Sequence, residues 1–319
     1  MFDLAKIDLI PLFFFLGMIA AWLKSDLEIP EPISKFLSIY LLLSLGLKGG
    51  QEVAKAVSPA ALLVSALLGL LFCWLIAMTF FKALKKPVGA ANAAGLAASF
   101  GSVSAVTYIA AEALLTNLKI SFSGHMVAVM AIMEVPAIIL ALYYFRRSFD
   151  STGVQLPSFQ GGLFSAKSVV LLLGGFVIGS VMPPASFAQI APVFKDPFKG
   201  VLAFFLLDLG ILAQRQLHSA WAYKAKALVV GIIGPLAFGT MMSLVATASG
   251  LERGDVFLLS VLAGSASYIA APAAIRSSIP GANPSLYVAL PLGLTFPFNL
   301  TLGLPYYFWL SGIMRGFFS

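Results

Sequence analysis

The sequence has little of what metal proteins and soluble enzymes use: one cysteine, two histidines, and charged residues at only 10% of the chain. The single cysteine, Cys73, lies in an apolar run and has no partner for an intrachain disulfide. So few cysteines and histidines leave no ligand set for zinc or an iron–sulfur cluster. Soluble domains average about 25% charged residues. The composition, with 60% hydrophobic residues, therefore predicts a membrane protein without a second, soluble domain.

Motifs that bind nucleotides or carry catalysis are also missing. There is no nucleophile elbow, no His-Glu metal motif and no P-loop, so the sequence predicts neither an enzyme nor a bound cofactor. The formal net charge is +7, yet the basic residues occur singly or in pairs between apolar runs. That pattern is typical of loops that set membrane topology, and it argues against nucleic-acid binding.

Apolar runs near the roughly 20 residues needed to cross the hydrocarbon core recur along the whole chain. We expect an all-α, polytopic membrane protein of ten transmembrane helices, with the N-terminal run as a first span and not a signal peptide. Residues 1–150 hold five segments, a polar connector follows at 151–167, and residues 168–319 hold five more. The ten segments lie near 7–23, 29–47, 57–81, 88–114, 122–145, 168–183, 197–213, 225–249, 255–277 and 284–313.

Lysine and arginine are distributed unequally between the two sides of this topology. Eight lie on the side of the termini and twelve on the side of the 146–167 connector. The positive-inside rule then predicts a cytoplasmic connector and outside termini, in a multi-pass protein of the inner (plasma) membrane.

The two halves share short motifs at nearly constant spacing. Three pairs, offset by 163 or 164 residues, carry the likeness: "LLSLGL" (42–47) with "LLDLGI" (206–211), "GSVS" (101–104) with "GSAS" (264–267), and "YYF" (143–145) with "YYF" (306–308). Because five spans is an odd number, the second half would enter the membrane from the opposite side. This predicts two inverted five-helix repeats; a helical bundle with coincidental matches is the alternative.

Both Gly-Ser motifs fall in the fourth span of their half, within "SFGSVSAVTYIAA" (99–111) and "LAGSASYIAAPAAIRSSIPGANPS" (262–285). Glycine and proline destabilise a lipid-facing helix, but they are tolerated where a helix is interrupted and lines a cavity. We expect two crossing broken helices whose N-terminal ends offer amides to a small anion. The anion or a hard cation would be bound by the hydroxyls of Ser102, Ser104, Ser265 and Ser267. The alternative is that these small residues only allow close helix packing.

Glu134, in "AVMAIMEVPAIIL", is the most exceptional single residue, because a carboxylate within a span costs about 2.5–3.5 kcal/mol on insertion scales. Pro136 predicts a kink that frees carbonyls beside it. We interpret Glu134 as a cation ligand or proton carrier. The alternative is a carboxyl that is simply hydrogen-bonded inside the bundle.

Other polar residues within or beside the spans have weaker claims. Asp208 is a second buried acid, and Asn92 and Asn299 could add amide oxygens, although each is more often a helix-packing hydrogen bond. Glu112 lies at the end of a span, where snorkelling or interface pairing is the usual role, and His125 has no assigned role.

Several stretches together resemble one known family. They are "IPEPISKFLSIYLLLSLGLKGG" (29–50), "FGSVSAVT" (100–107), "KIS" (119–121) with "MEVPAI" (133–138), and, most specific, "RSSIPGANPSLY" (276–287). On these residues the chain is similar, over nearly its whole length, to the sodium-dependent bicarbonate transporters of the SbtA type.

The resemblance implies a homotrimer in which a transport domain moves against a scaffold domain as an elevator. It also implies that the crossing helices hold bicarbonate, with sodium bound alongside. The anion site would then be lined by Ser102, Val103, Ser104, Ser265, Ala266 and Ser267. Glu134 matches a family aspartate, and the candidate sodium ligands are Glu134, Thr107 and Asn299. Cyanobacterial members also bind a PII-like regulatory protein.

Two features depart from the family pattern. Tyr268 stands where the family has an aspartate that contributes to sodium binding, and the 146–167 connector is short where cyanobacterial members have a long loop. We expect sodium-driven transport of bicarbonate or a similar small anion. Three alternatives stay open: proton coupling through Glu134, another small carboxylate substrate, and an uncoupled anion channel or non-transporting sensor.

Overall fold

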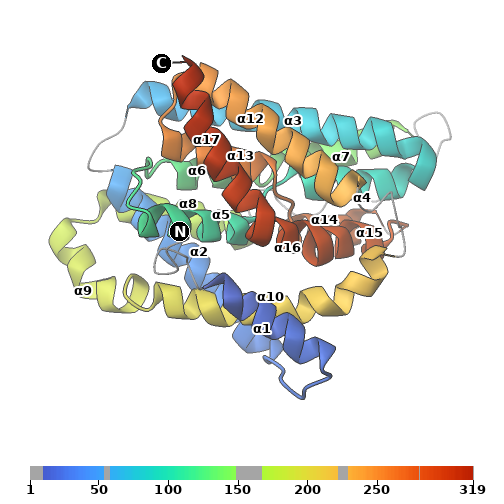
Figure 1. Ribbon diagram of the computed structural model, residues 1–319, viewed down its shortest axis with the longest axis horizontal. Helices are drawn as coiled ribbons and strands as arrows, with labels where there is room; N and C mark the ends of the chain where they lie inside the picture. The colour runs from blue at the N-terminus through green and yellow to red at the C-terminus, as the bar shows by residue number, and fades with distance from the viewer. Residues whose placement is uncertain (1–9, 54–57, 149–166, 222–228, 280, 319) are drawn as a thin grey trace.

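The computed structural model describes residues 10–53, 58–148, 167–221, 229–279 and 281–318, and all regular structure in these ranges is helical (Figure 1). This confirms the expected all-α chain. The first half forms α1 (Pro11–Trp22), α2 (Glu31–Val53), α3 (Pro59–Val88), α4 (Ala90–Gly101), α5 (Ala105–Asn117), α6 (Met126–Met133) and α7 (Pro136–Arg147). The connector predicted at 151–167 lies outside the described residues except for Lys167, where α8 begins.

The second half contains α-helices and three π-helical turns. It forms α8 (Lys167–Val181), α9 (Pro184–Phe194), α10 (Phe198–Trp221), η3 (Val229–Ile233), α12 (Gly234–Ala248), α13 (Arg253–Ala263), α14 (Ala270–Ser278), α15 (Pro284–Tyr287), η4 (Pro291–Thr295), α16 (Phe296–Phe298), η5 (Asn299–Gly303) and α17 (Leu304–Phe318).

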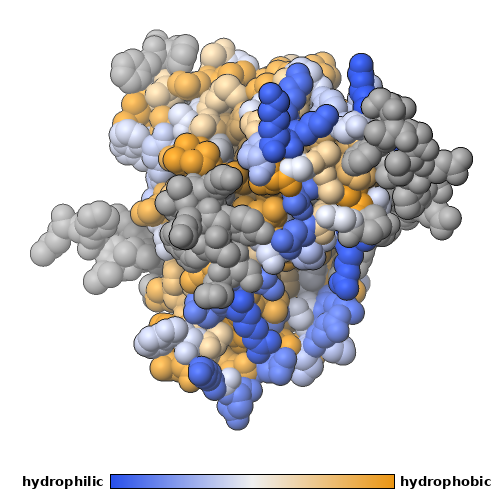
Figure 2. Space-filling view, turned by 90° about the vertical axis from the view of Figure 1, so that its right-hand side faces the viewer, coloured by the Kyte–Doolittle hydropathy of each residue, from blue (hydrophilic) through white to orange (hydrophobic). Residues whose placement is uncertain are grey.

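Many of these helices have the length and surface of membrane helices. Six stretches of the described chain are long and apolar enough to cross a membrane: Glu31–Gln51, Pro59–Val88, Ala90–Asn117, Met126–Arg147, Val229–Ala248 and Pro284–Met314. Leu63, Leu67 and Leu71, spaced by one helical turn along α3, are each at least half exposed. Figure 2 shows hydrophobic side chains over much of one face, between clusters of hydrophilic ones. Such a surface suits lipid, so the protein is a polytopic membrane protein.

The ends of α3 show how local sequence sets a helix boundary. Ser58 caps the helix, since its Oγ accepts a hydrogen bond from the Ala61 amide at 3.4 Å, and Pro59 takes the first position, where no N–H is needed. The helix ends at Gly89, which has a φ of +84°. Glycine adopts this positive φ without strain because it has no Cβ. The next helix, α4, begins at once and packs back along α3.

The helices form two groups, which Figure 1 shows with α1, α2, α9 and α10 at the bottom and α3 and α12 at the top. We call α1, α2, α8, α9 and α10 the peripheral group, and α3 to α7 with η3 and α12 to α17 the core group. In the peripheral group α1 packs along α10 and α2 along α8, so each pair joins the two halves of the chain. In the core group α3 packs on α4 and α7, and α12 packs on α13 and α17.

Glycines bring the paired peripheral helices into backbone contact. Gly17 of α1 and Gly210 of α10 face the partner helix so closely that a Cβ on either would overlap a carbonyl oxygen of that partner. Gly50 and Gly179 have the same relation across α2 and α8. Because lipid tails are as apolar as the side chains, such close van der Waals packing is what holds membrane helices together.

A single methyl group tests this packing. Gly210→Ala should destabilise the protein by about 1–3 kcal/mol, because the new Cβ has to push the Phe14 carbonyl away. Gly200→Ala, in the same helix, is the matched control, since its Cβ would have no neighbour within 4 Å. Thermal unfolding of the detergent-solubilised variants measures the difference, and equal unfolding temperatures would contradict the close contact.

Candidate anion site at two helix breaks

The first helix break lies between α4 and α5, at residues 102–104. The backbone is extended at Ser102 and at Ser104. Ser104 caps α5, because its Oγ accepts hydrogen bonds from the Thr107 amide (3.1 Å) and from the Thr107 hydroxyl (2.8 Å). These two bonds use the lone pairs of the Ser104 oxygen, so its O–H stays available as a donor.

The second break lies between α13 and α14, at residues 264–269. Ser265 Oγ donates to the Leu262 carbonyl at 2.9 Å, and Ser267 Oγ accepts from the Ala271 amide at 3.2 Å. The second serine of each Gly-Ser-x-Ser motif therefore accepts a bond from an amide at the start of the next helix. The predicted interruption of both spans at these motifs is observed.

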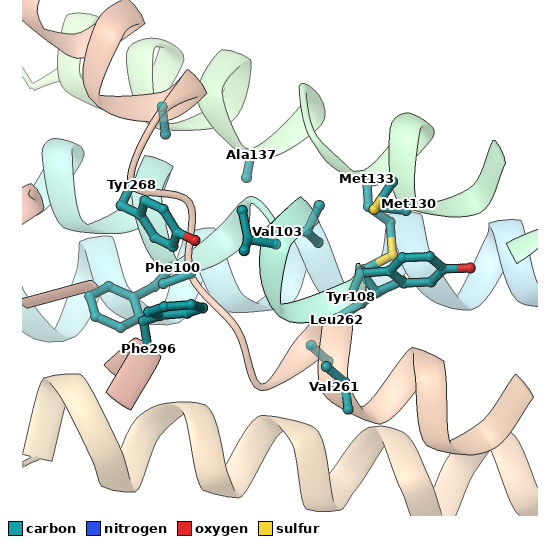
Figure 3. Close-up of a cluster of buried hydrophobic side chains, with 14 of the residues drawn as sticks. Phe100, Val103, Tyr108, Met130, Met133, Ala137, Val261, Leu262, Tyr268 and Phe296 are labelled. Carbon is teal, nitrogen blue, oxygen red and sulfur yellow. The ribbon is translucent and has the colours of Figure 1, made fainter. Parts of the chain in front are cut away.

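Direct hydrogen bonds join the two breaks. The Ser104 amide donates to Ser265 Oγ at 3.0 Å, and the Ser267 amide donates to the Ser99 carbonyl at 2.7 Å. Figure 3 shows Val103 and Tyr268, from the two breaks, close to each other. The six residues predicted to line the anion site are thus brought together, each at most 4% exposed: Ser102, Val103, Ser104, Ser265, Ala266 and Ser267.

The glycines of the two motifs have a packing role. A Cβ on Gly101 would lie 2.7 Å from the Ala137 Cβ, and a Cβ on Gly264 would overlap the Tyr307 hydroxyl. The close-packing interpretation is therefore correct for these glycines. It does not account for the serines, which bond across and along the breaks.

Several amides at the breaks form no hydrogen bond within the described part of the chain. They belong to Val103, Ala105 and Val106 at the first break and to Ala266, Tyr268, Ile269 and Ala270 at the second. They lie at or just before the N-termini of α5 and α14, where the helix dipole is positive. Residues 99–107 and 262–271 contain no lysine or arginine. The arrangement is suited to a small anion held by dipoles and hydroxyls instead of by a fixed charge.

Glu134 lies beside the first break. The helix α6 ends at Met133 and α7 begins at Pro136, so the carbonyl of Glu134 is free to accept a bond from Ser102 Oγ at 2.6 Å. The predicted kink at Pro136 is present, and Glu134 is 6% exposed. The backbone of Glu134 is therefore bonded to Ser102 of the first break, and its side chain is buried.

Asn299 has the corresponding place beside the second break. Its Nδ2 donates to the Gly264 carbonyl at 2.9 Å, while its Oδ1 is buried and has no hydrogen-bond partner in the described chain. An amide oxygen of this kind can coordinate a hard cation such as sodium. Thr107, the third predicted cation ligand, lies at the first break and bonds Ser104.

Two other predicted candidates lie away from the breaks. Asp208 of α10 accepts a hydrogen bond from Ser34 of α2, within the peripheral group. Asn92 donates to the Val88 carbonyl at 2.8 Å and accepts from the Asn283 amide at 2.7 Å. Each has the helix-packing role that is commoner for such residues.

Lys48 and Asp255 make polar contacts that no sequence motif predicts, and the pairing of Glu112 agrees with the interface pairing expected for it. Lys48 of α2 forms an ion pair with Glu112 of α5, which joins the two helix groups. Asp255 accepts hydrogen bonds from the amide and the hydroxyl of Ser123, both at 2.7 Å. No sequence pattern could find these partners, since each comes from a different segment.

An apolar groove of about 530 Å³ lies between α1, α10 and residues 293–301. Gln214 and Thr301 are its polar side chains, and none of its lining residues is charged. Its lining is almost wholly apolar and includes no residue of the two breaks, so the candidate anion site is a separate place.

The geometry of the breaks does not by itself identify a protein family, but a comparison with known families does. The family model of the Na⁺-dependent bicarbonate transporter superfamily matches residues 10–312. The chain belongs to this superfamily. The resemblance seen in the motifs is thereby confirmed, and members of the superfamily are transporters and not enzymes, as the missing catalytic motifs predicted. No curated protein sequence matches the chain.

The bond between the breaks has a measurable contribution to stability. Ser265→Ala removes the acceptor of the buried Ser104 amide and should lower the free energy of unfolding by about 1–3 kcal/mol. Ser249→Ala is the control, because that exposed hydroxyl bonds only the Val245 carbonyl of its own helix. Unfolding temperatures are compared without sodium and bicarbonate, and no difference between the variants would exclude this bond.

Proposed function

We propose that this protein is a secondary active transporter that carries bicarbonate together with sodium. The observation that carries the proposal is the pair of joined, buried helix breaks, which leave unbonded amides and the Ser104 hydroxyl as donors and which contain no lysine or arginine. Membership of a Na⁺-dependent bicarbonate transporter superfamily supports this substrate and this coupling ion. Ser102, Val103, Ser104, Ser265, Ala266 and Ser267 are the proposed anion site.

The coupling follows from the missing charge. Dipoles and hydroxyls solvate an anion but do not neutralise it, so a cation bound nearby strengthens anion binding and the anion strengthens cation binding. Glu134, Thr107 and Asn299 are the proposed cation ligands. With Tyr268 in the place of a family aspartate, Glu134 is the carboxyl left to supply negative charge, and its titration would allow protons to replace sodium.

We further propose ten spans in two inverted repeats, residues 1–150 and 168–319, joined by the connector. Three features support this: α1 pairs with α10 as α2 pairs with α8, α3 packs on α4 as α12 packs on α13, and Glu134 and Asn299 take similar places beside the two breaks. In an elevator mechanism the peripheral group would be the scaffold and the core group the moving part. The homotrimer, the PII-like partner, and the inner-membrane orientation with outside termini stay predictions.

Reconstituted uptake tests the function. Proteoliposomes that contain the protein should concentrate labelled bicarbonate when an inward sodium gradient is imposed, and should not do so without one. Uptake that ignores sodium and follows a pH gradient would replace sodium coupling with proton coupling. No concentration under any gradient would favour the channel or sensor alternative and overturn the proposal.

The cation site has its own test. Glu134→Gln removes the charge but keeps the shape, and we expect the sodium concentration for half-maximal uptake to rise about tenfold. Asp208→Asn is the matched control, since Asp208 is a buried carboxyl that bonds Ser34 away from the breaks. Unchanged sodium dependence in Glu134→Gln, or an equal effect in Asp208→Asn, would exclude Glu134 as a ligand.

A further inference from the structure

Tyr268 places a buried hydroxyl at the second break. The residue is 8% exposed, and its hydroxyl has no hydrogen-bond partner in the described chain. The Ser104 side chain of the first break is its polar neighbour, although the two hydroxyls do not meet hydrogen-bond geometry. Buried polar groups in proteins are nearly always bonded, so an unbonded hydroxyl at this place needs an explanation.

Apolar contacts hold the Tyr268 ring in position. The ring packs on Phe296, with 5.3 Å between centroids, and Phe296 packs edge-on against Phe14 of α1 at 5.1 Å. Figure 3 shows the Tyr268 hydroxyl pointing from this aromatic cluster towards Val103. A phenylalanine would make the same ring contacts, so packing does not require the oxygen.

Both breaks carry hydrogen-bond donors that have no acceptor in the described chain. The Ser104 oxygen already accepts two bonds from Thr107, which leaves its O–H to donate. The Val103 amide, and the amide of Tyr268 itself, are also unbonded. Several donors around one buried place match an oxyanion, which accepts several hydrogen bonds at once.

We propose that the Tyr268 hydroxyl is a ligand of the transported anion, donating a hydrogen bond to the same bicarbonate that Ser104 binds. This inference rests on the proposed function and adds to it a residue that determines affinity. The side chain is neutral, so it strengthens anion binding without supplying a charge for sodium. Its role thus differs from that of a carboxylate at the same position.

Removal of one oxygen atom tests the proposal. Tyr268→Phe should weaken bicarbonate binding about tenfold, the size expected for one lost hydrogen bond to a charged group. Titration calorimetry on the detergent-solubilised full chain, with sodium bicarbonate at saturating sodium and mildly alkaline pH, measures the affinity. The matched control is Tyr108→Phe, because Tyr108 also has a buried hydroxyl without a hydrogen-bond partner but lies further along α5. We expect it to bind bicarbonate as the unmodified protein does.

The possible results distinguish the role of Tyr268 from the proposed transport function. Unchanged affinity in Tyr268→Phe overturns the role of Tyr268 while the proposed function stands. A lower unfolding temperature with unchanged affinity assigns the hydroxyl to stability and also overturns it. No bicarbonate binding by the unmodified protein overturns the proposed function and this inference together.

Discussion

Backbone amides and carbonyls buried away from water cost several kcal/mol when they have no partner, and this protein interrupts two helices in its buried centre. Many of the polar groups around the breaks form hydrogen bonds that reduce this cost. Ser104 caps α5, Ser267 accepts a bond from the Ala271 amide in the first turn of α14, and the two breaks bond each other through Ser265 and Ser99. The fifth segment of each half adds a bond of its own, through Glu134 or Asn299. The amides that are still unbonded include those of Val103 and Ala266, which belong to the proposed anion site.

Contacts inside the peripheral group can be compared with contacts between the two helix groups. Inside the peripheral group, glycines place backbone against backbone, and such contacts leave no room for side chains to rearrange. Between the groups, side chains make contacts such as the Lys48–Glu112 ion pair and the Phe14–Phe296 ring contact, and Gly293 of η4 packs on the backbone of α10. The proposed elevator mechanism would require the contacts between the groups to be exchanged while the backbone contacts inside the peripheral group are kept.

Much of the site was predictable because its signals are local. A Gly-Ser-x-Ser motif inside an apolar run conflicts with a lipid-facing helix wherever it occurs, and its recurrence 163 residues later marked both breaks. Pro136 marked the end of α6 in the same way, because a proline has no amide to continue a helix. Asp208 is also an acid within an apolar run, as Glu134 is, but it lies in the peripheral group and bonds Ser34. The two could not be told apart from the sequence, because an acid in one segment does not reveal which helix it faces.

The sequence by itself determined the all-helical membrane architecture, the superfamily and the positions of the two breaks. Each of these depends on hydropathy, on backbone chemistry or on motifs that lie within a short stretch of chain. Only the tertiary structure decided which segments meet: α1 with α10, Lys48 with Glu112, and the Ser104 amide with the hydroxyl oxygen of Ser265. The reason is physical. Contacts across helices depend on rotation and depth, which residues far apart in the chain set jointly and no single segment encodes.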